Sequence, residues 1–429
     1  MADTIRVLIF PAGEINSIEL HDALSTSVNV EVFGGSSVDR HGPFVFRNYI
    51  GEIPLISDPQ FIEHFNQVLS DNRIDVVFPT HDTVADYFAE HHDDIRAKVV
   101  VAAPETAAIC RDKMKTYQTF SDTHFIPTIF ELVDAVGQLP VFIKPRIGQG
   151  SVGARLVEHE EDLHSIIFED YVVTEYLSGK EYTVDCLTDK NGQLKIVSPR
   201  SRDRTLAGVS VAGKTVALTQ EIQEIAQTIN DRLKFKGLWF FQVKADHEQR
   251  LKLMEISTRC AGTMCLTRAR GANLPLLSVY TVMGYDVDVL VNDMDVTVDR
   301  MLINRYNFDY NYQTVYFDFD DTLIIREQVH PYSIMFLYQC KNMQKEVVLI
   351  TKHADDIRQT LRNYAIDPAL FAKIIHLAPD DNKIDLMEEH PEGAIFIDNA
   401  FTERKYVHDR FKIPVFDVDA IEVLLDWRI

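Results

Sequence analysis

Apolar and polar positions follow one rhythm through the first hundred residues of this 429-residue chain. Short apolar runs such as 6–10 predict buried strands, and stretches such as 59–69, where Phe61, Phe65 and Leu69 recur every four residues, predict helices. Strands that alternate with helices favour a parallel sheet covered on both faces. The predicted strands are 6–10, 28–33, 75–78 and 98–102, with helices at 14–24, 59–69 and 84–89. An α/β domain is therefore expected over residues 1–104.

The rhythm changes near Pro104. A single helix is predicted over 105–120, followed mainly by strands, and Asn191-Gly192 between two β-rich runs predicts a hairpin turn. The predicted strands are 141–143, 154–157, 171–175, 182–187, 238–243 and 251–256, with a long helix at 221–233. This pattern is typical of an α+β domain, here expected over residues 105–300.

Strict alternation returns after a connector over 299–313 that is rich in Asn and Tyr. The predicted strands are 314–319, 346–351, 373–377, 394–397 and 413–416, and the helices are 331–342, 354–364, 383–389 and 401–410. A second α/β domain is expected over residues 312–429. The whole chain is predicted to be an α/β and α+β multidomain protein.

Composition narrows the possible partners. A formal net charge of −22 argues against nucleic acid and anionic membrane surfaces, because both would repel the chain. Five cysteines without a metal-ligand spacing suggest reduced thiols, and no run of about 18 apolar residues is present. We expect a soluble, cytoplasmic protein that binds small molecules.

One glycine-rich loop has the chemistry of phosphate binding. Residues 148–153 spell G-x-G-x-x-G, but a dinucleotide site needs a helix directly after the glycines, and here 154–157 predicts a strand. A strand, a glycine loop and a second strand form a flap that can lay backbone N–H groups over ATP phosphates. Taken alone, an ordinary glycine-rich hairpin explains the loop equally well. The chain has no H-R-D or D-F-G sequence, which argues against the protein-kinase fold.

The loop stands within an ordered set of polar positions. Lys113 and Lys144 precede it, the stretch 174–185 follows it, and 241–243 and 254–259 form two strands with polar ends. This order resembles the ATP-grasp superfamily, in particular its carbamoyl-phosphate-synthase-like branch, over roughly residues 1 to 300. The resemblance implies that the first α/β domain is a Rossmann-like pre-ATP-grasp domain and that 105–300 is an ATP-grasp fold.

The resemblance also implies site residues. Those assigned to ATP are Lys113, Lys144, Gly148, Gly150, Ser151, Gly153, Glu175, Tyr176, Leu177 and Glu181. Gln242, Glu255 and Ser257 would hold Mg²⁺, and Arg259 would stabilise the transferring phosphoryl group. Ser257 stands where the family usually has a metal-binding Asn. A serine hydroxyl binds Mg²⁺ less strongly, so the number of metal ions stays open.

Four cations between these motifs are candidates for gripping an anionic substrate, since Arg binds carboxylate or phosphate bidentately. They are Arg200, Arg202, Arg204 and Lys214. A solvated basic stretch is an equally good interpretation of this group.

A second kind of chemistry opens the last quarter of the chain. An apolar strand runs into Asp318-Phe319-Asp320-Asp321-Thr322, and such carboxylates lie at the strand ends where open α/β sheets bind ligands. Thr351 and Asp398 end two later strands, and Lys383 opens a helix. This set resembles the haloacid dehalogenase (HAD) superfamily. From Asp318 to Thr351 there are only 351 − 318 = 33 positions, too few for a large cap domain.

The resemblance implies an aspartyl-phosphate mechanism. Asp318 would attack phosphorus, Asp320 would act as general acid and base, and Thr351 and Lys383 would hold the phosphoryl oxygens. Asp318, the Asp320 carbonyl and Asp398 would bind Mg²⁺.

The leading hypothesis is a bifunctional enzyme. An ATP-dependent ligase would join a small-molecule carboxylate to an amine, or another nucleophile, through an acyl phosphate, and a phosphatase would act on a phosphorylated metabolite of the same pathway. Two alternatives stay open: an ATP-grasp kinase with a stable phosphorylated product, and a nucleotide-sensing module with a HAD scaffold. Related ligases also suggest a homodimer.

Overall fold

The computed structural model describes residues 4–165, 168–206, 208–307, 309–387 and 393–428. The chain divides into two compact units, one ending at Leu302 and the other running from Ile303 to Arg428. Within the described residues, no helix is both long and apolar enough to cross a membrane.

The first unit begins with a parallel five-stranded sheet of order β3-β2-β1-β4-β5. Its strands are β1 (Ile5–Phe10), β2 (Val30–Gly35), β3 (Asn48–Ile50), β4 (Val76–Pro79) and β5 (Lys98–Val99), and its helices are α1 (Ile15–Leu24), α2 (Gly42–Val45), α3 (Phe61–Asp71) and α4 (Asp82–Glu90). Strand β1 is almost entirely buried, as its continuous apolar run requires. The predicted parallel α/β arrangement is confirmed, although the short strand β3 was not predicted.

Three further sheets complete this unit. The first contains β6 (Val141–Pro145), β7 (Arg155–Val157) and β8 (Tyr171–Glu175); the second β9 (Glu181–Thr188), β10 (Leu194–Ser201), β13 (Gly237–Ala245) and β14 (Leu251–Ser257); the third β11 (Arg204–Leu206), β12 (Val209–Lys214) and β15 (Thr297–Asp299). All their strand pairs are antiparallel. The helices are α5 (Pro104–Arg111), α6 (Lys113–Thr119), α7 (Leu132–Ala135), α8 (Gln220–Arg232), α9 (Cys265–Ala269) and α10 (Leu274–Val282), with 3-10 turns η1 (Val136–Gln138), η2 (Glu160–Ser165) and η3 (Phe168–Asp170).

The prediction of a single helix over 105–120 is wrong, because the helix is interrupted at Asp112. This residue has extended backbone angles and caps the new helix α6, where its carboxylate accepts a bond of 2.9 Å from the Met114 N–H. It also pairs with Arg146 at 2.6 Å. Apolar periodicity continues through the break, so only the capping chemistry marks it. The break places Lys113 at the first position of α6.

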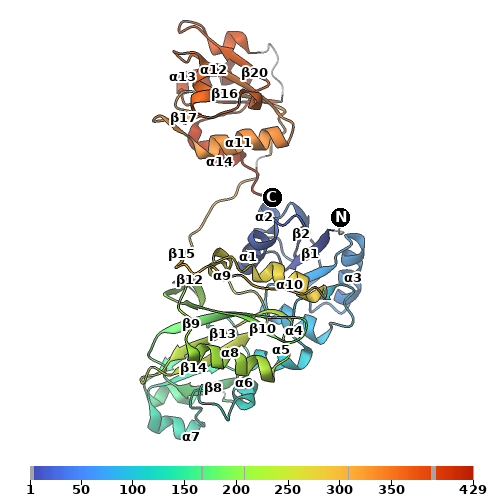
Figure 1. Cartoon of the computed structure of the whole chain (residues 1–429), viewed down its shortest axis with the longest axis vertical. Helices are drawn as coiled ribbons and strands as arrows, with labels where there is room; N and C mark the ends of the chain where they lie inside the picture. Colours follow the sequence, from blue (N-terminus) through green and yellow to red (C-terminus); the bar gives the residue numbers. More distant parts are fainter. Residues whose placement is uncertain (1–3, 166–167, 207, 308, 388–392, 429) are drawn as a thin grey trace. The chain divides into compact units, whose positions relative to one another are not determined.

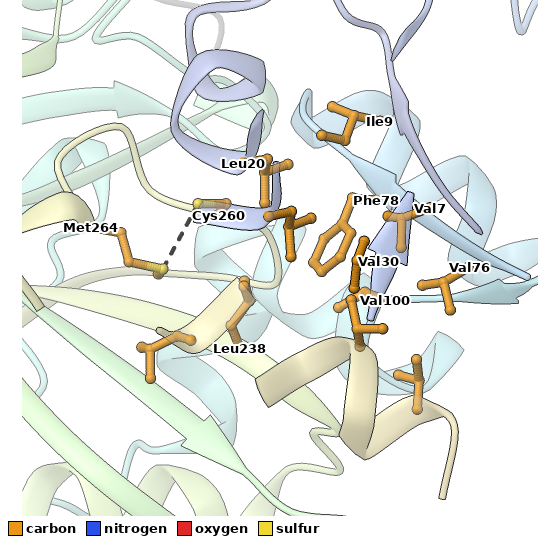
Figure 2. Close-up of a cluster of buried hydrophobic side chains, with 14 of the residues drawn as sticks. Val7, Ile9, Leu20, Val30, Val76, Phe78, Val100, Leu238, Cys260 and Met264 are labelled. Carbon is orange, nitrogen blue, oxygen red and sulfur yellow. Dashed lines mark hydrogen bonds between the residues drawn. The ribbon is translucent and has the colours of Figure 1, made fainter. Parts of the chain in front are cut away.

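The two domains predicted over 1–104 and 105–300 share a hydrophobic core. Val7 and Phe78 of the first sheet belong to the same buried cluster as Leu238 of β13 and Met264 beside α9 (Figure 2). A boundary near residue 104 therefore does not separate two cores, and the domain division there stays a prediction.

The second unit contains another parallel sheet, of order β20-β19-β16-β21-β22 (Figure 1). Its strands are β16 (Thr314–Phe317), β19 (Glu346–Thr351), β20 (Lys373–His376), β21 (Ala394–Ile397) and β22 (Val415–Phe416), and its helices are α11 (Pro331–Asn342), α12 (Ile357–Asn363), α13 (Phe401–Phe411) and α14 (Ile421–Leu424). Alternate residues of β16 pack into two hydrophobic clusters on opposite faces of the sheet: Val315 and Phe317 belong to one cluster, and Tyr316 belongs to the other.

The connections in this unit are short. Between Asp318 and the start of β19 at Glu346 the chain forms only the hairpin β17 (Ile324–Ile325) and β18 (Gln328–Val329) and helix α11, so this stretch contains no cap domain. Three 3-10 turns complete the unit: η4 (Pro368–Leu370), η5 (Lys383–Leu386) and η6 (Val418–Ala420). A helix was predicted over 383–389. The structure has only the short turn η5 there, and residues 388 and 389 lie outside the described residues.

Candidate active sites

A pocket of about 200 Å³ in the first unit collects residues that are far apart in the sequence. Its walls include the carboxyl end of β4, the loop after β6, the middle of β13 and the end of β14. The predicted site residues that line it are Lys113, Gly148, Gly150, Arg200, Arg202, Gln242, Glu255, Ser257 and Arg259. The fold thus brings together phosphate-binding, metal-binding and catalytic candidates.

Two buried lysines stand at this site without a carboxylate partner in the described part of the chain. Lys113 Nζ donates to the Gly148 carbonyl at 3.4 Å, and Lys144 Nζ donates to the Met254 carbonyl at 3.0 Å. Burial lowers the pKa of both side chains, that of Lys144 to about 8, and the nearby Glu255 charge opposes the shift. Two desolvated ammonium groups of this kind favour a bound anion.

The glycine loop joins β6 to its antiparallel partner β7, which confirms the predicted strand, loop and strand. Gly150, Ser151 and Gly153 have left-handed backbone angles (φ of 62°, 57° and 77°). A Cβ on Gly153 would also lie 3.0 Å from the Pro145 ring. The tight backbone path explains the glycines and directs main-chain groups toward the pocket.

Gln242 and Glu255 form a candidate Mg²⁺ site. They are direct cross-strand partners in β13 and β14, and both are half-buried on the pocket wall. Directly opposed side chains lie on the same face of a sheet, so an amide oxygen and a carboxylate stand side by side. Among the described residues, no three His, Cys, Asp or Glu side chains gather as a metal cluster. This donor set fits Mg²⁺, which usually takes one or two carboxylates together with phosphate oxygens and water.

Arg259 is held by a residue that was not predicted. Asp82, at the start of α4, accepts bonds from Arg259 Nε at 2.9 Å and Nη2 at 2.8 Å, and from Ser257 Oγ at 3.1 Å. Burial acts to raise the pKa of Asp82, but the Arg259 charge and hydrogen bonds hold it below its usual value. The sequence did contain a signal for Asp82. It follows the buried parallel strand β4 closely, and the carboxyl ends of such strands form ligand sites.

Arg259 keeps part of its binding capacity. Its Nη1 donates to the Cys260 carbonyl at 3.0 Å, while Asp82 takes one N–H each from Nε and Nη2. A guanidinium has five N–H groups. Within the described residues, one N–H on Nη1 and one on Nη2 therefore have no acceptor.

The residues predicted to contact adenine and ribose are not part of the pocket lining. Glu175 accepts from the Thr128 N–H at 2.8 Å, and Glu181 forms an ion pair with Arg202 at 2.6 Å. Tyr176 is exposed and Leu177 is buried. Lys144, Ser151 and Gly153 also flank the lining. Their contacts with a nucleotide stay predictions.

The four cations predicted to grip a substrate do not form one group. Arg200 is fully buried. Its Nε and Nη2 donate to the two carboxylate oxygens of Asp185 at 2.8 and 3.0 Å, so its charge is already neutralised inside the fold. Arg202 lines the pocket while pairing with Glu181. Arg204 and Lys214 are exposed on the third sheet and lie outside the lining.

A family model described as "ATP-grasp in the biosynthetic pathway with Ter operon" matches residues 167–301. The biotin carboxylase domain of 2-oxoglutarate carboxylase from Hydrogenobacter thermophilus, solved with MgADP, ADP and bicarbonate, superposes over 67% of this chain and 71% of its own, with a TM-score of 0.55 and 16% identity. The first unit thus has a mixed α/β fold that is similar to that of ATP-grasp proteins. We refer to it below as the ATP-grasp unit.

Two curated ligases match parts of the chain. 3-Methyl-D-ornithine–L-lysine ligase from Methanosarcina barkeri (strain Fusaro / DSM 804) is 28% identical over 158 residues, which are 35% of this chain and 40% of the relative. D-Alanine–D-alanine ligase A from Clostridium perfringens (strain 13 / Type A) is 26% identical over 115 residues, which are 23% and 38%. The chain thus spans about two fifths of the length of these relatives.

The second unit contains a separate cluster of buried charges at the carboxyl edge of its sheet. Lys383 Nζ lies 2.6 Å from Asp318 and 2.6 Å from Asp398. Burial and the Asp398 charge raise the pKa of Asp318 to about 6, and burial raises the pKa of Asp398. Burial acts to lower the pKa of Lys383, but the two carboxylates outweigh it and raise the value.

Three neighbouring residues support this cluster. Thr322 Oγ donates to Asp318 at 3.2 Å and accepts the Asn399 N–H at 3.1 Å. Arg404 donates to the main-chain carbonyls of Asp398 and Asn399 at 2.6 and 2.7 Å. None of the three supporting residues was predicted as a site residue, although Thr322 belongs to the quoted motif. They fix the loop that carries Asp398.

The donor set of this cluster suits a hard cation. A single ammonium already bridges Asp318 and Asp398, so the two carboxylates are close enough to share one positive ion. Carboxylates together with a main-chain carbonyl are ligands that Mg²⁺ accepts. Of the other predicted residues, Thr351 is buried at the end of β19 and accepts the His353 N–H at 3.2 Å, and Asp320 contacts His353.

Proposed function

We propose that the ATP-grasp unit is an ATP-dependent ligase that activates a small-molecule carboxylate and transfers its acyl group to an amine. The observation that carries this proposal is the pair of buried lysines that have no carboxylate partner in the described part of the chain and stand near Gln242 and Glu255. Such a pocket has cations for phosphates and oxygen ligands for the metal ion that accompanies them. The two matching ligases support the same class of reaction.

In this proposal Lys113 and Lys144 hold the nucleotide phosphates, and the glycine loop covers them. Gln242 and Glu255, with Ser257 beside them, would hold Mg²⁺, which supplies charge neutralisation at the β- and γ-phosphates. The two N–H groups left on Arg259 bind the carboxylate or the phosphoryl oxygens bidentately. Arg111, which lines the pocket and has no carboxylate partner among the described residues, is a further anion-binding candidate.

The chemistry follows from the weak reactivity of a carboxylate. Its oxygen attacks the γ-phosphorus of ATP, the bond to ADP breaks, and an acyl phosphate forms. The amine then attacks the acyl carbon, phosphate leaves, and the amine loses a proton. Positively charged groups around the transferring phosphoryl group lower the barrier of the first step.

We propose that the second unit is a phosphatase that acts through an aspartyl phosphate in the same pathway. Asp318 attacks phosphorus while Asp320 gives a proton to the leaving oxygen. Water then attacks the same phosphorus, gives its proton to Asp320 and releases phosphate from Asp318. Lys383 and Thr351 hold the phosphoryl oxygens, and Asp318, the Asp320 carbonyl and Asp398 would hold Mg²⁺. The contact of Lys383 with both acids supports this proposal.

The coupling is tested with the Asp318→Asn variant, which keeps the ATP-grasp unit unchanged. Both full-length proteins are incubated with ATP, Mg²⁺ and a metabolite extract, and their products are compared by mass spectrometry. We expect a phosphorylated compound that accumulates only with the variant. Equal product profiles with ATP consumed in both would contradict the coupling.

The same experiment separates the alternatives. A phosphorylated product that persists without an amine would support the kinase hypothesis over ligation. No ATP consumption and no phosphatase activity in either protein would support a nucleotide-sensing module. A homodimer and a cytoplasmic location stay predictions.

A further inference from the structure

A histidine that the sequence analysis did not select faces the proposed acid and base of the second unit. His353 Nδ1 lies 2.9 Å from Asp320 Oδ1 and 3.1 Å from Oδ2. An ionised carboxylate only accepts hydrogen bonds, so Nδ1 carries the proton when Asp320 is charged. The ring nitrogen is therefore centred between the two oxygens of the side chain that the proposed mechanism uses.

The imidazole ring is fixed from several sides. Its Nε2 lies 3.1 Å from Thr360 Oγ on α12, and its plane meets the Phe319 ring edge-on at 5.0 Å between centroids. The main chain of His353 is also held, because its N–H donates to Thr351 Oγ at 3.2 Å and its carbonyl accepts from His376 Nε2 at 2.7 Å. Few rotations are open to a ring with partners on both nitrogens and a packed face.

Asp320 is far less constrained by itself. Its side chain is 52% exposed, against 15% for His353, and His353 is the one side-chain partner of its carboxylate among the described residues. An exposed carboxylate without a partner samples several rotamers. The rigid member of this pair is the histidine, so the histidine sets the direction of the acid.

We propose that His353 is a positioning residue for Asp320: it holds the carboxylate in one orientation for proton transfer to and from the leaving oxygen. This inference rests on the proposed phosphatase function. His353 touches neither the phosphoryl group nor the leaving oxygen, and it acts only through Asp320. Thr360 and Phe319 in turn position His353.

The inference makes a prediction about leaving groups. An alkoxide is a poor leaving group and needs the proton that Asp320 supplies, whereas p-nitrophenolate leaves without one. Loss of the proton donor therefore slows the cleavage of alkyl phosphates more than that of aryl phosphates. A residue with a purely structural role would slow both equally.

The experiment compares kcat/KM of the full-length protein for p-nitrophenyl phosphate and for glycerol 2-phosphate, with Mg²⁺. The constant kcat/KM reports the first chemical step, which includes departure of the leaving group. We expect Asp320→Asn to lower the alkyl-to-aryl ratio by about 10²-fold or more, the scale of general acid catalysis. His353→Asn is expected to lower the same ratio about tenfold, and Thr360→Val by a few fold.

Two variants complete the design. His408→Asn changes an exposed histidine on α13 and is expected to leave the ratio unchanged. Thr360→Val leaves the imidazole in place, so it tests the positioning chain even if His353→Asn disturbs folding. Asp318→Asn removes the nucleophile and is expected to abolish turnover of both substrates.

Several outcomes would overturn the inference. An unchanged ratio in His353→Asn, or an equal loss on both substrates, would assign His353 a structural role. A large increase in KM for both esters would place it on the phosphoryl group. Turnover by wild type that persists in Asp318→Asn, or no turnover by wild type, would instead remove the proposed phosphatase function and the inference with it.

Discussion

Both candidate sites of this protein are built around buried lysines, but their charge balance is opposite. In the ATP-grasp unit, Lys113 and Lys144 have carbonyl partners and no carboxylate within ion-pair distance among the described residues, and burial lowers the pKa of each. In the second unit, Lys383 bridges Asp318 and Asp398 and its pKa is raised.

The difference indicates what each site requires from its ligand. The lysines of the ATP-grasp unit carry a desolvation cost that a bound anion can offset, which fits nucleotide phosphates. The second site is already neutralised in part by its own ammonium, so a dianionic phosphoryl group needs an additional cation there. A buried lysine therefore indicates an anion-binding site only when no carboxylate of the protein already pairs with it.

The largest expected effect is the loss of Lys383. Lys383→Met leaves two buried carboxylates next to each other, and breaking a buried ion pair costs about 3–5 kcal/mol. We expect the unfolding transition of the second unit to fall accordingly in scanning calorimetry. Lys405→Met is the matched control, because its pair with Asp409 in the same unit is exposed and screened by water, and its effect on the transition is expected to be much smaller. An equally small effect for Lys383→Met would contradict the claim that the second site depends on its own buried ammonium group for stability.

A smaller loss is expected for the ion pair that holds Arg259. Asp82→Asn keeps the shape but removes the charge, and we expect a loss of about 2 kcal/mol in the unfolding free energy of the ATP-grasp unit. The cost is below that of Lys383 because both partners are about a fifth exposed, at 17% and 18%.

The control for this variant is Asp122→Asn. Asp122 also meets an arginine bidentately, at 2.6 and 2.9 Å from Arg232, but its side chain is 68% exposed. Its loss is expected to leave the stability almost unchanged, because water screens an exposed ion pair. Chemical denaturation of both variants checks the difference, and equal costs would show that burial does not strengthen the Asp82 pair.

Lys144→Met is expected to separate binding from stability. Removal of one charge-assisted contact weakens the binding of an MgATP analogue by about tenfold, measured by calorimetry. The protein without nucleotide is expected to be as stable as wild type or slightly more so, because a desolvated charge is gone. Lys98→Met, on the exposed edge of β5, serves as the control and is expected to change neither quantity. A clear loss of stability in Lys144→Met would contradict the idea of a site poised for an anion.

The smallest effect concerns pH. The pKa of Lys144 is lowered to about 8 in the folded state from 10.5, so this group favours the folded state above pH 10.5 and that contribution is lost as the pH falls through 8. Nucleotide phosphates favour the charged form, so binding takes up a proton above pH 8. We expect the affinity to fall by a few fold between pH 8 and 9, and Lys144→Met to remove this dependence. Calorimetry in buffers of different ionisation heat measures the proton uptake directly.

Patterns along the chain predicted much of this architecture. Continuous apolar runs predicted both parallel sheets, and the strand on each side of the glycine loop was correct. The helix break at Asp112 was missed, because apolar periodicity does not register a capping carboxylate. The four cations that the sequence placed in one group do not lie together, since a sequence does not reveal that Asp185 neutralises Arg200 inside the fold.

The sequence by itself determined which chemical groups the protein can bring to its sites, because strand ends, glycine loops and acidic motifs are local patterns. Tertiary structure decided which groups act together. Asp82 and Arg259 are 177 positions apart in the sequence. They form an ion pair because the fold brings the start of α4 to the end of β14. His353 and Asp320 are 33 positions apart and meet because β16 and β19 are neighbouring parallel strands. The pairing of side chains sets their charge state and direction, and both depend on distances that only the folded chain fixes.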